Sequence, residues 1–278
     1  MVDLTNTQNA AARRGLSVTA IKLMALGLML LDHLHYFFEF TGIPPLFFSM
    51  LGRLSGGMFL FAAVEGFSHT RDRRKYFLRI YLMGAAMGAL NLILMLFLRR
   101  PDGFYPQNNI LATLTVLMVF WQGFDDLRGR KYLRGAMLIA IPAALFVIVP
   151  RLPKRWMPGA FILESIFLPL PMMTEGGVPE LLCGLAMYLF RARRKLQVGV
   201  WAALLLGWNL FIGIAYGLPF GAQWITYHYE WMGVFAAIPM LLYNGERGRG
   251  MKGLFYAFYP AHVYALYALS CLAYARMN

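Results

Sequence analysis

Helix-length runs of apolar residues, repeated along the chain and separated by short basic loops, constrain this sequence more than any other feature. A helix needs about 20 mostly apolar residues to cross the hydrocarbon core of a bilayer. Only 14% of the residues are charged, whereas a soluble domain usually carries about 25%. The sequence therefore predicts an all-α polytopic membrane protein, one helical bundle domain over residues 1–278, in which residues 1–18 form a polar cytoplasmic tail.

The apolar runs predict about nine spans, with eight to ten as the range. We expect them at approximately 20–40, 47–67, 76–98, 109–123, 135–149, 178–190, 198–218, 223–243 and 254–274. The stretch RLPKRWMPGAFILESIFLPLPMMTEGG follows the fifth run and contains several prolines. Its apolar pieces are too short for a full span, so we interpret it as a loop with a re-entrant or broken helix that carries Glu164. Irregular backbone at membrane depth must line protein or water.

The net charge of +13 would suggest nucleic acid in a soluble protein, but here the basic residues cluster in the short loops. Basic loops mark the cytoplasmic side of a membrane protein. Nine spans with a cytoplasmic N-terminus place HTRDRRKY, DDLRGRK, RARRK and GERGRGMK inside. Two basic pairs, at 99–100 and 154–155, violate the rule, and a count of ten stays open. We expect a bacterial inner-membrane protein in contact with the bilayer and no nucleic-acid partner.

The sequence offers little sign of a metal site or of a cleavable leader. Cys183 and Cys271 lie far apart in apolar runs without metal-ligand spacing. We interpret them as two buried thiols and expect no metal ion. The polar N-terminus lacks the short apolar core of a signal peptide.

Three polar residues end the first apolar run: Asp32, His33 and His35. Ionisable groups at membrane depth are costly and generally mark functional sites. At 1.5 Å per residue, His33 lies roughly 20 Å from the inner end of this helix, in the outer half of the membrane. Arg53 lies near the start of the next span, which runs in the opposite direction, so we expect Asp32 and Arg53 to pair across the first hairpin.

The chemistry of these groups suggests proton transfer. A histidine has a pKa near neutrality and can act as a general base or nucleophile, which an adjacent acid can orient. We therefore take His33, Asp32 and Arg53 as candidate catalytic residues. His35, Asn109 and His262 are candidate acceptor-binding residues. For His35 the alternative is an interfacial aromatic cluster, and for Asn109 it is a helix N-cap that needs no ligand.

A second polar set lies toward the expected cytoplasmic side. It is strongly basic, and a basic mouth suits a polyanionic donor such as coenzyme A. Each part of this set has an alternative interpretation. The basic run is then only a signal for membrane orientation, and Glu65 and His69 form a helix cap and a side-chain pair at the inner end. Tyr243–Gly245 is then only a helix C-terminal turn. The candidate donor-binding residues are Lys22, Glu65, His69, Arg71, Arg73, Arg74, Lys75, Asn244, Arg247 and Lys252.

Four stretches resemble the TraX family, which takes its name from the protein that acetylates the N-terminus of F-type conjugative pilin. They are IKLMALGLMLLDHL, LGRLSGGMFLFAAVEGFSHTRDRRKYFLR, NNILATL and AAIPMLLYNGERGRGMKGLFYAFYPAHVYALY. They cover about a third of the chain and occur in the expected order. The resemblance implies a membrane transferase that uses acetyl-CoA for pilin acetylation in conjugation.

The TraX family is in turn similar to wider membrane acyltransferases, which act on polysaccharides or on heparan glucosamine. In the polysaccharide enzymes a basic residue precedes a histidine of the first span by eleven positions. Lys22 and His33 have that spacing, with lysine in place of the usual arginine. The resemblance thus implies that His33 is the catalytic histidine and acetyl-CoA the donor. The middle of the chain, roughly 131–220, departs from this pattern and leaves the acceptor open between a pilin peptide and a glycan.

Two other functional classes stay open. A transporter or flippase for an anionic lipid-linked substrate would also carry intramembrane charges, although the chain has no evident internal repeat. A non-catalytic subunit of a pilus or secretion machine would use the same charges only to pair its helices.

Overall fold

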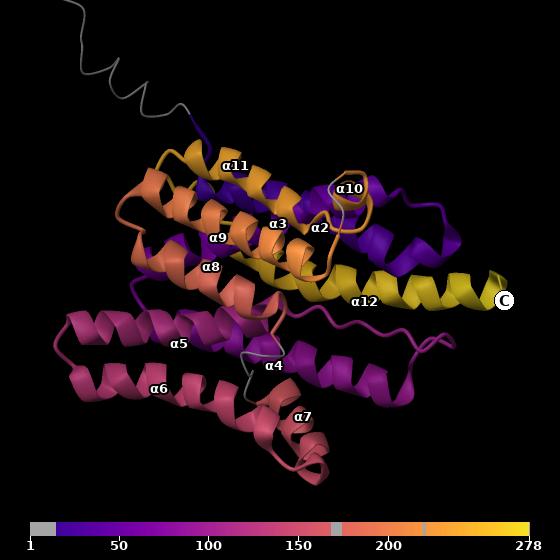
Figure 1. Cartoon of the computed structure of the whole chain (residues 1–278), viewed down its shortest axis with the longest axis horizontal. Coiled ribbons are helices and arrows are strands. Elements are labelled where there is room, and N and C mark those ends of the chain that lie inside the picture. Colours follow the sequence, from indigo (N-terminus) through magenta and orange to yellow (C-terminus); the bar gives the residue numbers. More distant parts are fainter. Residues whose placement is uncertain (1–14, 168–173, 219–220, 278) are drawn as a thin grey trace, which may run out of the picture. The chain divides into compact units, whose positions relative to one another are not determined.

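The computed structural model describes residues 15–167, 174–218 and 221–277, and the secondary-structure elements of these residues are helices joined by loops (Figure 1). The chain divides into two compact units. Unit 1 comprises residues 1–65 and 190–258, and unit 2 comprises residues 66–189 and 259–278. Helices α3 (Leu46–His69) and α12 (Lys252–Met277) each contribute residues to both units.

Unit 1 is built on the hairpin of α2 (Val18–Phe38) and α3. The Ser17 hydroxyl caps α2 by accepting from the Ala20 amide at 3.2 Å. Helix α2 is followed by the short η1 (Glu39–Thr41), and Gly42, with φ of +67°, begins the turn toward α3. The unit continues with α9 (Arg194–Ala215), α10 (Gln223–Thr226), η4 (Glu230–Ala236) and α11 (Ala237–Leu241), and α9 packs on both η4 and α11.

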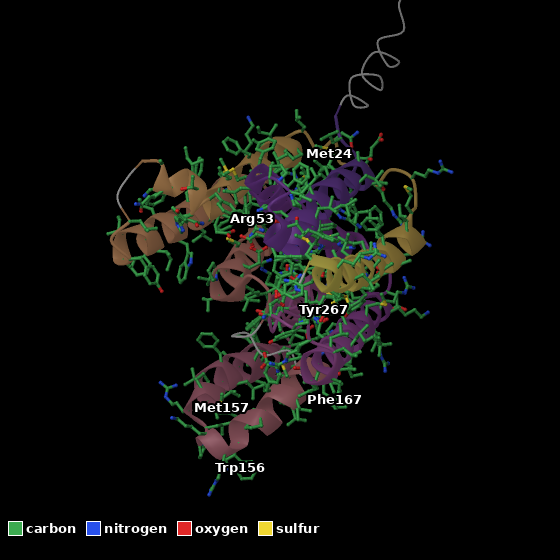
Figure 2. All side chains as sticks on the ribbon, turned by 90° about the vertical axis from the view of Figure 1, so that its right-hand side faces the viewer. Met24, Arg53, Trp156, Met157, Phe167 and Tyr267 are labelled. Atoms are coloured by element: carbon green, nitrogen blue, oxygen red, sulfur yellow. The ribbon has the colours of Figure 1, made fainter. Side chains whose placement is uncertain are left out.

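Unit 2 is an array in which α4 (Arg73–Phe97) packs on α5 (Ile110–Arg128), and α5 packs on α6 (Tyr132–Ile148) (Figure 1). The chain then passes through η2 (Val149–Arg151) and η3 (Lys154–Trp156) into α7 (Met157–Ile166), which packs back on α4. Helix α8 (Gly177–Leu189) packs on α5. Trp156 and Met157 lie at the exposed turn into α7 (Figure 2).

Six of the described helices are long and apolar enough to cross a membrane, and they confirm a helical membrane-type chain. They are 18–41, 46–69, 73–97, 110–128, 132–151 and 194–215. Helix α6 is almost wholly apolar, yet hardly any of its side chains are buried within the protein, as expected of a lipid-facing helix. The region 153–177 contains short helices, as predicted, although its residues 168–173 lie outside the described part.

The prediction of a continuous span over 223–243 was wrong. That region holds a one-turn α-helix, a 3₁₀ segment and a short α11, and only 230–241 forms an apolar helix. Pro239 lacks a backbone donor and Gly233 lowers helix propensity, so an uninterrupted α-helix is costly here. Helix α8 covers 13 residues, fewer than the roughly 20 of a perpendicular span. The six candidate helices do not establish the predicted count of nine.

Candidate functional site

The central polar feature of unit 1 is an ion-paired cluster of Asp32, Ser49, Arg53 and Glu230, called here the hairpin cluster. Arg53 Nη2 lies 2.6 Å from Asp32 Oδ1 and 2.8 Å from Asp32 Oδ2. Arg53 Nη1 lies 3.1 Å from Glu230 Oε1 and 3.2 Å from Oε2. The Ser49 hydroxyl donates to Asp32 at 2.5 Å. The predicted pairing of Asp32 with Arg53 across the hairpin is therefore confirmed.

The two partners of Arg53 differ in exposure. The side chain of Asp32 is 15% exposed, whereas that of Glu230 is 53% exposed. The Arg53 guanidinium also lies 5.8 Å from the Tyr229 ring centre. Charge-assisted hydrogen bonds of this kind are stronger where water is excluded. The Asp32 arm is therefore the stronger of the two, and Glu230 forms the solvent-facing arm.

Two glycines allow the close approach that forms this cluster. A Cβ at Gly52 would collide with the Asp32 side chain, and a Cβ at Gly233 would lie 3.2 Å from the Arg53 carbonyl oxygen. Ser49 and Arg53 stand four residues apart on α3 and so share one helical face. The sequence thus brings α2, α3 and η4 together at this point.

His33 and His35 follow Asp32 of the hairpin cluster in the sequence. Both histidines are buried, with 3% and 8% exposure. The His33 ring centre lies 5.9 Å from that of Phe37 and 6.4 Å from that of Tyr36. The Tyr36 and Phe37 rings also contact each other edge to face. His33 thus sits in an aromatic environment next to a residue whose carboxylate is held by Arg53, an arrangement that can position an imidazole for proton transfer.

A second buried ion pair joins Glu65, near the end of α3, to Arg194 at the start of α9. Arg194 Nη2 lies 2.9 Å from Glu65 Oε1, and Glu65 is only 6% exposed. The guanidinium stacks on Phe61 at 4.4 Å and on Tyr243 at 4.7 Å. Arg194 was expected only as part of a basic orientation signal, so its pairing went unpredicted.

The loop after α11 covers the N-terminus of α2. The Glu246 and Arg247 carbonyls accept from the Val18 and Thr19 amides at 3.0 and 3.2 Å, which satisfies donors that the first turn of a helix leaves free. Asn244 accepts from the Glu246 amide at 2.9 Å. Gly245, with φ of +84°, confirms the predicted left-handed turn.

Other predicted donor residues of unit 1 lie near that end of α2. Lys22 lies 5.4 Å from the Phe255 ring centre, and Lys252 begins α12. The Arg247 and Arg249 side chains are exposed. This end of unit 1 therefore presents exposed cations that can bind phosphate groups.

The remaining predicted residues belong to unit 2. Arg73 lies 2.8 Å from Asp125 Oδ2, 3.3 Å from Gln122 Oε1 and 4.8 Å from the Phe67 ring centre, so it is held within its own unit. His69, Arg71, Arg74 and Lys75 are exposed. The Lys75 amide donates to Asp72 at 2.9 Å and lowers the pKa of that carboxyl.

Asn109 occupies the N-cap position of α5 but makes no capping bond with its side chain. Its amide instead donates to the Gly84 carbonyl at 2.9 Å, and the Ile110 amide donates to the Tyr259 hydroxyl at 3.1 Å. His262 is 7% exposed, two residues after Pro260, and its ring lies 5.8 Å from that of Tyr259. Asn109 therefore takes the N-cap position of the alternative interpretation, but its side chain bonds to α4 and not to the first turn of α5.

The structure therefore brings Asp32 and Arg53 together and adds three residues that the sequence analysis did not choose: Ser49, Tyr229 and Glu230. Glu230 is an acidic residue inside the predicted span 223–243, which marks it as a polar group at membrane depth but does not identify its partner. Ser49 stands four residues before Arg53, which places it on the same helical face. The other predicted sites are distributed over the two units.

A comparison with protein-family models finds a match to the TraX protein family over residues 17–270, nearly the whole chain. No curated protein and no solved structure matches the chain.

Proposed function

The chain belongs to the TraX family, and on that premise we propose that it is a membrane-embedded acetyltransferase. It transfers acetyl from cytoplasmic acetyl-CoA to an amine or hydroxyl, with a pilin N-terminus as the first acceptor to test and a glycan as the second. The association of the family with pilin acetylation supports this proposal. The observation that carries it is the buried His33, which follows directly in sequence the Asp32 whose carboxylate is fixed by Arg53.

His33 acts as the general base in this proposal. A nitrogen of its imidazole takes the proton of the acceptor N–H or O–H, and the acceptor lone pair then forms a bond to the thioester carbonyl carbon. The carbon–sulfur bond breaks, and the CoA thiolate leaves and is protonated. A variant of the scheme has His33 carry the acetyl group briefly as a nucleophile. The Asp32–Arg53 pair positions the helical turn that bears His33.

The donor phosphates are assigned to the basic side chains of the cytoplasmic loops. Exposed cations of the loop that covers the N-terminus of α2, Arg247 and Arg249, fit polyphosphate chemistry. We place the N-terminus in the cytoplasm of a bacterium, the protein in the inner membrane, and the chain in about nine spans. CoA should raise the unfolding temperature of the purified protein, and replacement of Arg71 and Arg74 by Ala should reduce that shift if they contact the donor.

One observation favours a second function. The two ion pairs, Asp32–Arg53 and Glu65–Arg194, connect different helices, as a non-catalytic assembly subunit would require. Thiol release from acetyl-CoA in the presence of a free-amine peptide separates the two functions. We expect release by the wild type and by His228→Ala, and its loss in His33→Ala. His228 serves as the control because it is another histidine of unit 1, and its Nε2 atom lies 2.9 Å from the Asn209 carbonyl oxygen. If folded wild type and His33→Ala release no more thiol than protein-free buffer with any acceptor, the enzyme assignment fails.

A further inference from the structure

Unit 2 contains a cavity of about 340 Å³ between α4, α7 and the chain segment that leads into α5. This volume is at the lower end of the range for small-ligand pockets. The cavity contains the side chains of Asn109 and Glu164. The sequence analysis predicts Asn109 as an acceptor-binding residue, but the mechanism proposed above uses no residue of this lining, so the occupant of the cavity is a separate question.

Close packing of α7 on α4 forms one wall. A Cβ at Gly88 would collide with the Ser165 carbonyl oxygen, and the Tyr81 hydroxyl donates to the Phe167 carbonyl at 2.8 Å. These contacts hold α7 against α4. Glu164 lies on α7 and is buried, with 8% exposure. The proline-rich segment therefore delivers a carboxyl group to a defined place.

Several hydroxyl and amide groups that line the cavity donate their hydrogen bonds to the protein itself. The hydroxyls of Thr115 and Ser165 donate to backbone carbonyls at 2.8 Å, as does that of Tyr81. The Asn109 amide nitrogen donates to Gly84, whereas the Asn109 Oδ1 atom is buried and has no hydrogen-bond partner among the described residues. Hydroxyl and amide oxygens and the Glu164 carboxyl thus remain as acceptors toward the cavity.

The described residues that line the cavity carry negative charge and no positive charge. Glu164 is the one charged residue among the described residues that line the cavity. The cation of Arg99 lies outside this lining, 5.5 Å from the ring centre of the rim residue Tyr105, and its side chain is exposed. An anion would meet acceptors and a carboxylate, whereas a cation with several N–H donors would complement both.

We propose that this cavity binds the ammonium group of a primary amine. A primary ammonium carries three N–H donors, which the Glu164 carboxylate, Asn109 Oδ1 and a hydroxyl oxygen can accept. The volume accommodates the ammonium and a short aliphatic or peptide segment. The amine can be a free small molecule or the N-terminus of a peptide, and the binding does not depend on acetyl transfer.

Titration calorimetry on the full-length protein in nanodiscs tests this assignment. We expect n-butylamine to bind and n-butanol, which lacks the charge, to bind at least roughly tenfold more weakly. An alanine-rich peptide with a free N-terminus, compared with its N-acetylated form, distinguishes a peptide amine from a free amine. Preference for the free peptide over n-butylamine identifies the peptide as the source, and the reverse identifies the small amine.

Two variants locate the site. Glu164→Gln should weaken n-butylamine binding by roughly tenfold or more, whereas Glu39→Gln, at an exposed carboxylate of unit 1, should leave it unchanged. Ala112→Leu fills the cavity and should abolish binding without altering its charge. The proposal is overturned if folded Glu164→Gln and Ala112→Leu both bind n-butylamine as the wild type does, or if butanol binds equally well. Acetyl transfer can fail while this binding persists, so the two proposals are tested separately.

Discussion

At the scale of single residues, the hairpin cluster demonstrates what the sequence can and cannot predict. Asp32 and Arg53 were predictable partners because two charges at similar membrane depth on consecutive helices must pair. Glu230 was not, because its position depends on the broken helix η4, which a continuous-span interpretation misses. The pairing of Arg194 with the buried Glu65 was obscured, because Arg194 lies in a run of basic residues.

The two carboxylates that bind Arg53 should contribute unequally to stability. Asp32→Asn removes a carboxylate that is 15% exposed, whereas Glu230→Gln alters one that is 53% exposed. We expect Asp32→Asn to cost roughly 1.5–3 kcal/mol of unfolding free energy, the range for buried charged hydrogen bonds, and Glu230→Gln less than about 1 kcal/mol. Thermal unfolding in detergent compares them, and equal losses would contradict the assignment of Asp32 as the stronger arm.

At the scale of secondary-structure elements, helix positions followed from the apolar runs, but helix contacts required the structure. The bounds of α2 and α3 lie within a few residues of the predicted 20–40 and 47–67. The close approach of these helices depends on Gly52, whose role no periodicity reveals. Likewise, Asn109 has the sequence signature of an N-cap but bonds to α4 instead, because tertiary contacts override local propensity.

Gly52 and Gly56 offer a matched test of this close approach, one turn apart on α3. Gly52→Ala would force a methyl group into Asp32, whereas the described residues leave open space around a Cβ at Gly56. We expect Gly52→Ala to destabilise the protein by about 1–3 kcal/mol through overpacking. Gly56→Ala should be neutral or stabilising by up to about 1 kcal/mol because alanine favours helix.

Thermal unfolding and acetyl transfer of both variants should be measured together. We expect Gly52→Ala to lose both stability and activity, since it displaces the helical turn that bears Asp32 and His33. Wild-type behaviour of Gly52→Ala would contradict the packing described for the hairpin.

At the scale of the whole molecule, composition predicted a helical membrane protein, and the six candidate spans agree. The division into two units could not be predicted, because α3 and α12 are each continuous in sequence while their residues belong to both units. The number of spans depends on how short helices such as α8 and η4–α11 meet the bilayer, which hydropathy alone does not decide.

The proposed orientation makes a direct prediction for loop accessibility. In a variant with Cys183 and Cys271 replaced by Ser, single cysteines at Arg71, Arg130, Arg193 and Arg249 should react with an impermeant maleimide only in inside-out vesicles. A cysteine at Asp102 should react in intact spheroplasts, because the third and fourth spans place it outside. Labelling of positions 193 and 249 from the outside would contradict nine spans and favour ten.

The most direct measurement of the central claim is the mass of an acceptor peptide after incubation with acetyl-CoA and the purified protein. We expect wild type and His228→Ala to add one acetyl group to a peptide with a free N-terminal amine, and folded His33→Ala to leave the peptide unmodified. An unmodified peptide with wild-type protein across amine and hydroxyl acceptors, or equal acetylation by His33→Ala, would contradict the assignment of this chain as an acetyltransferase that uses His33.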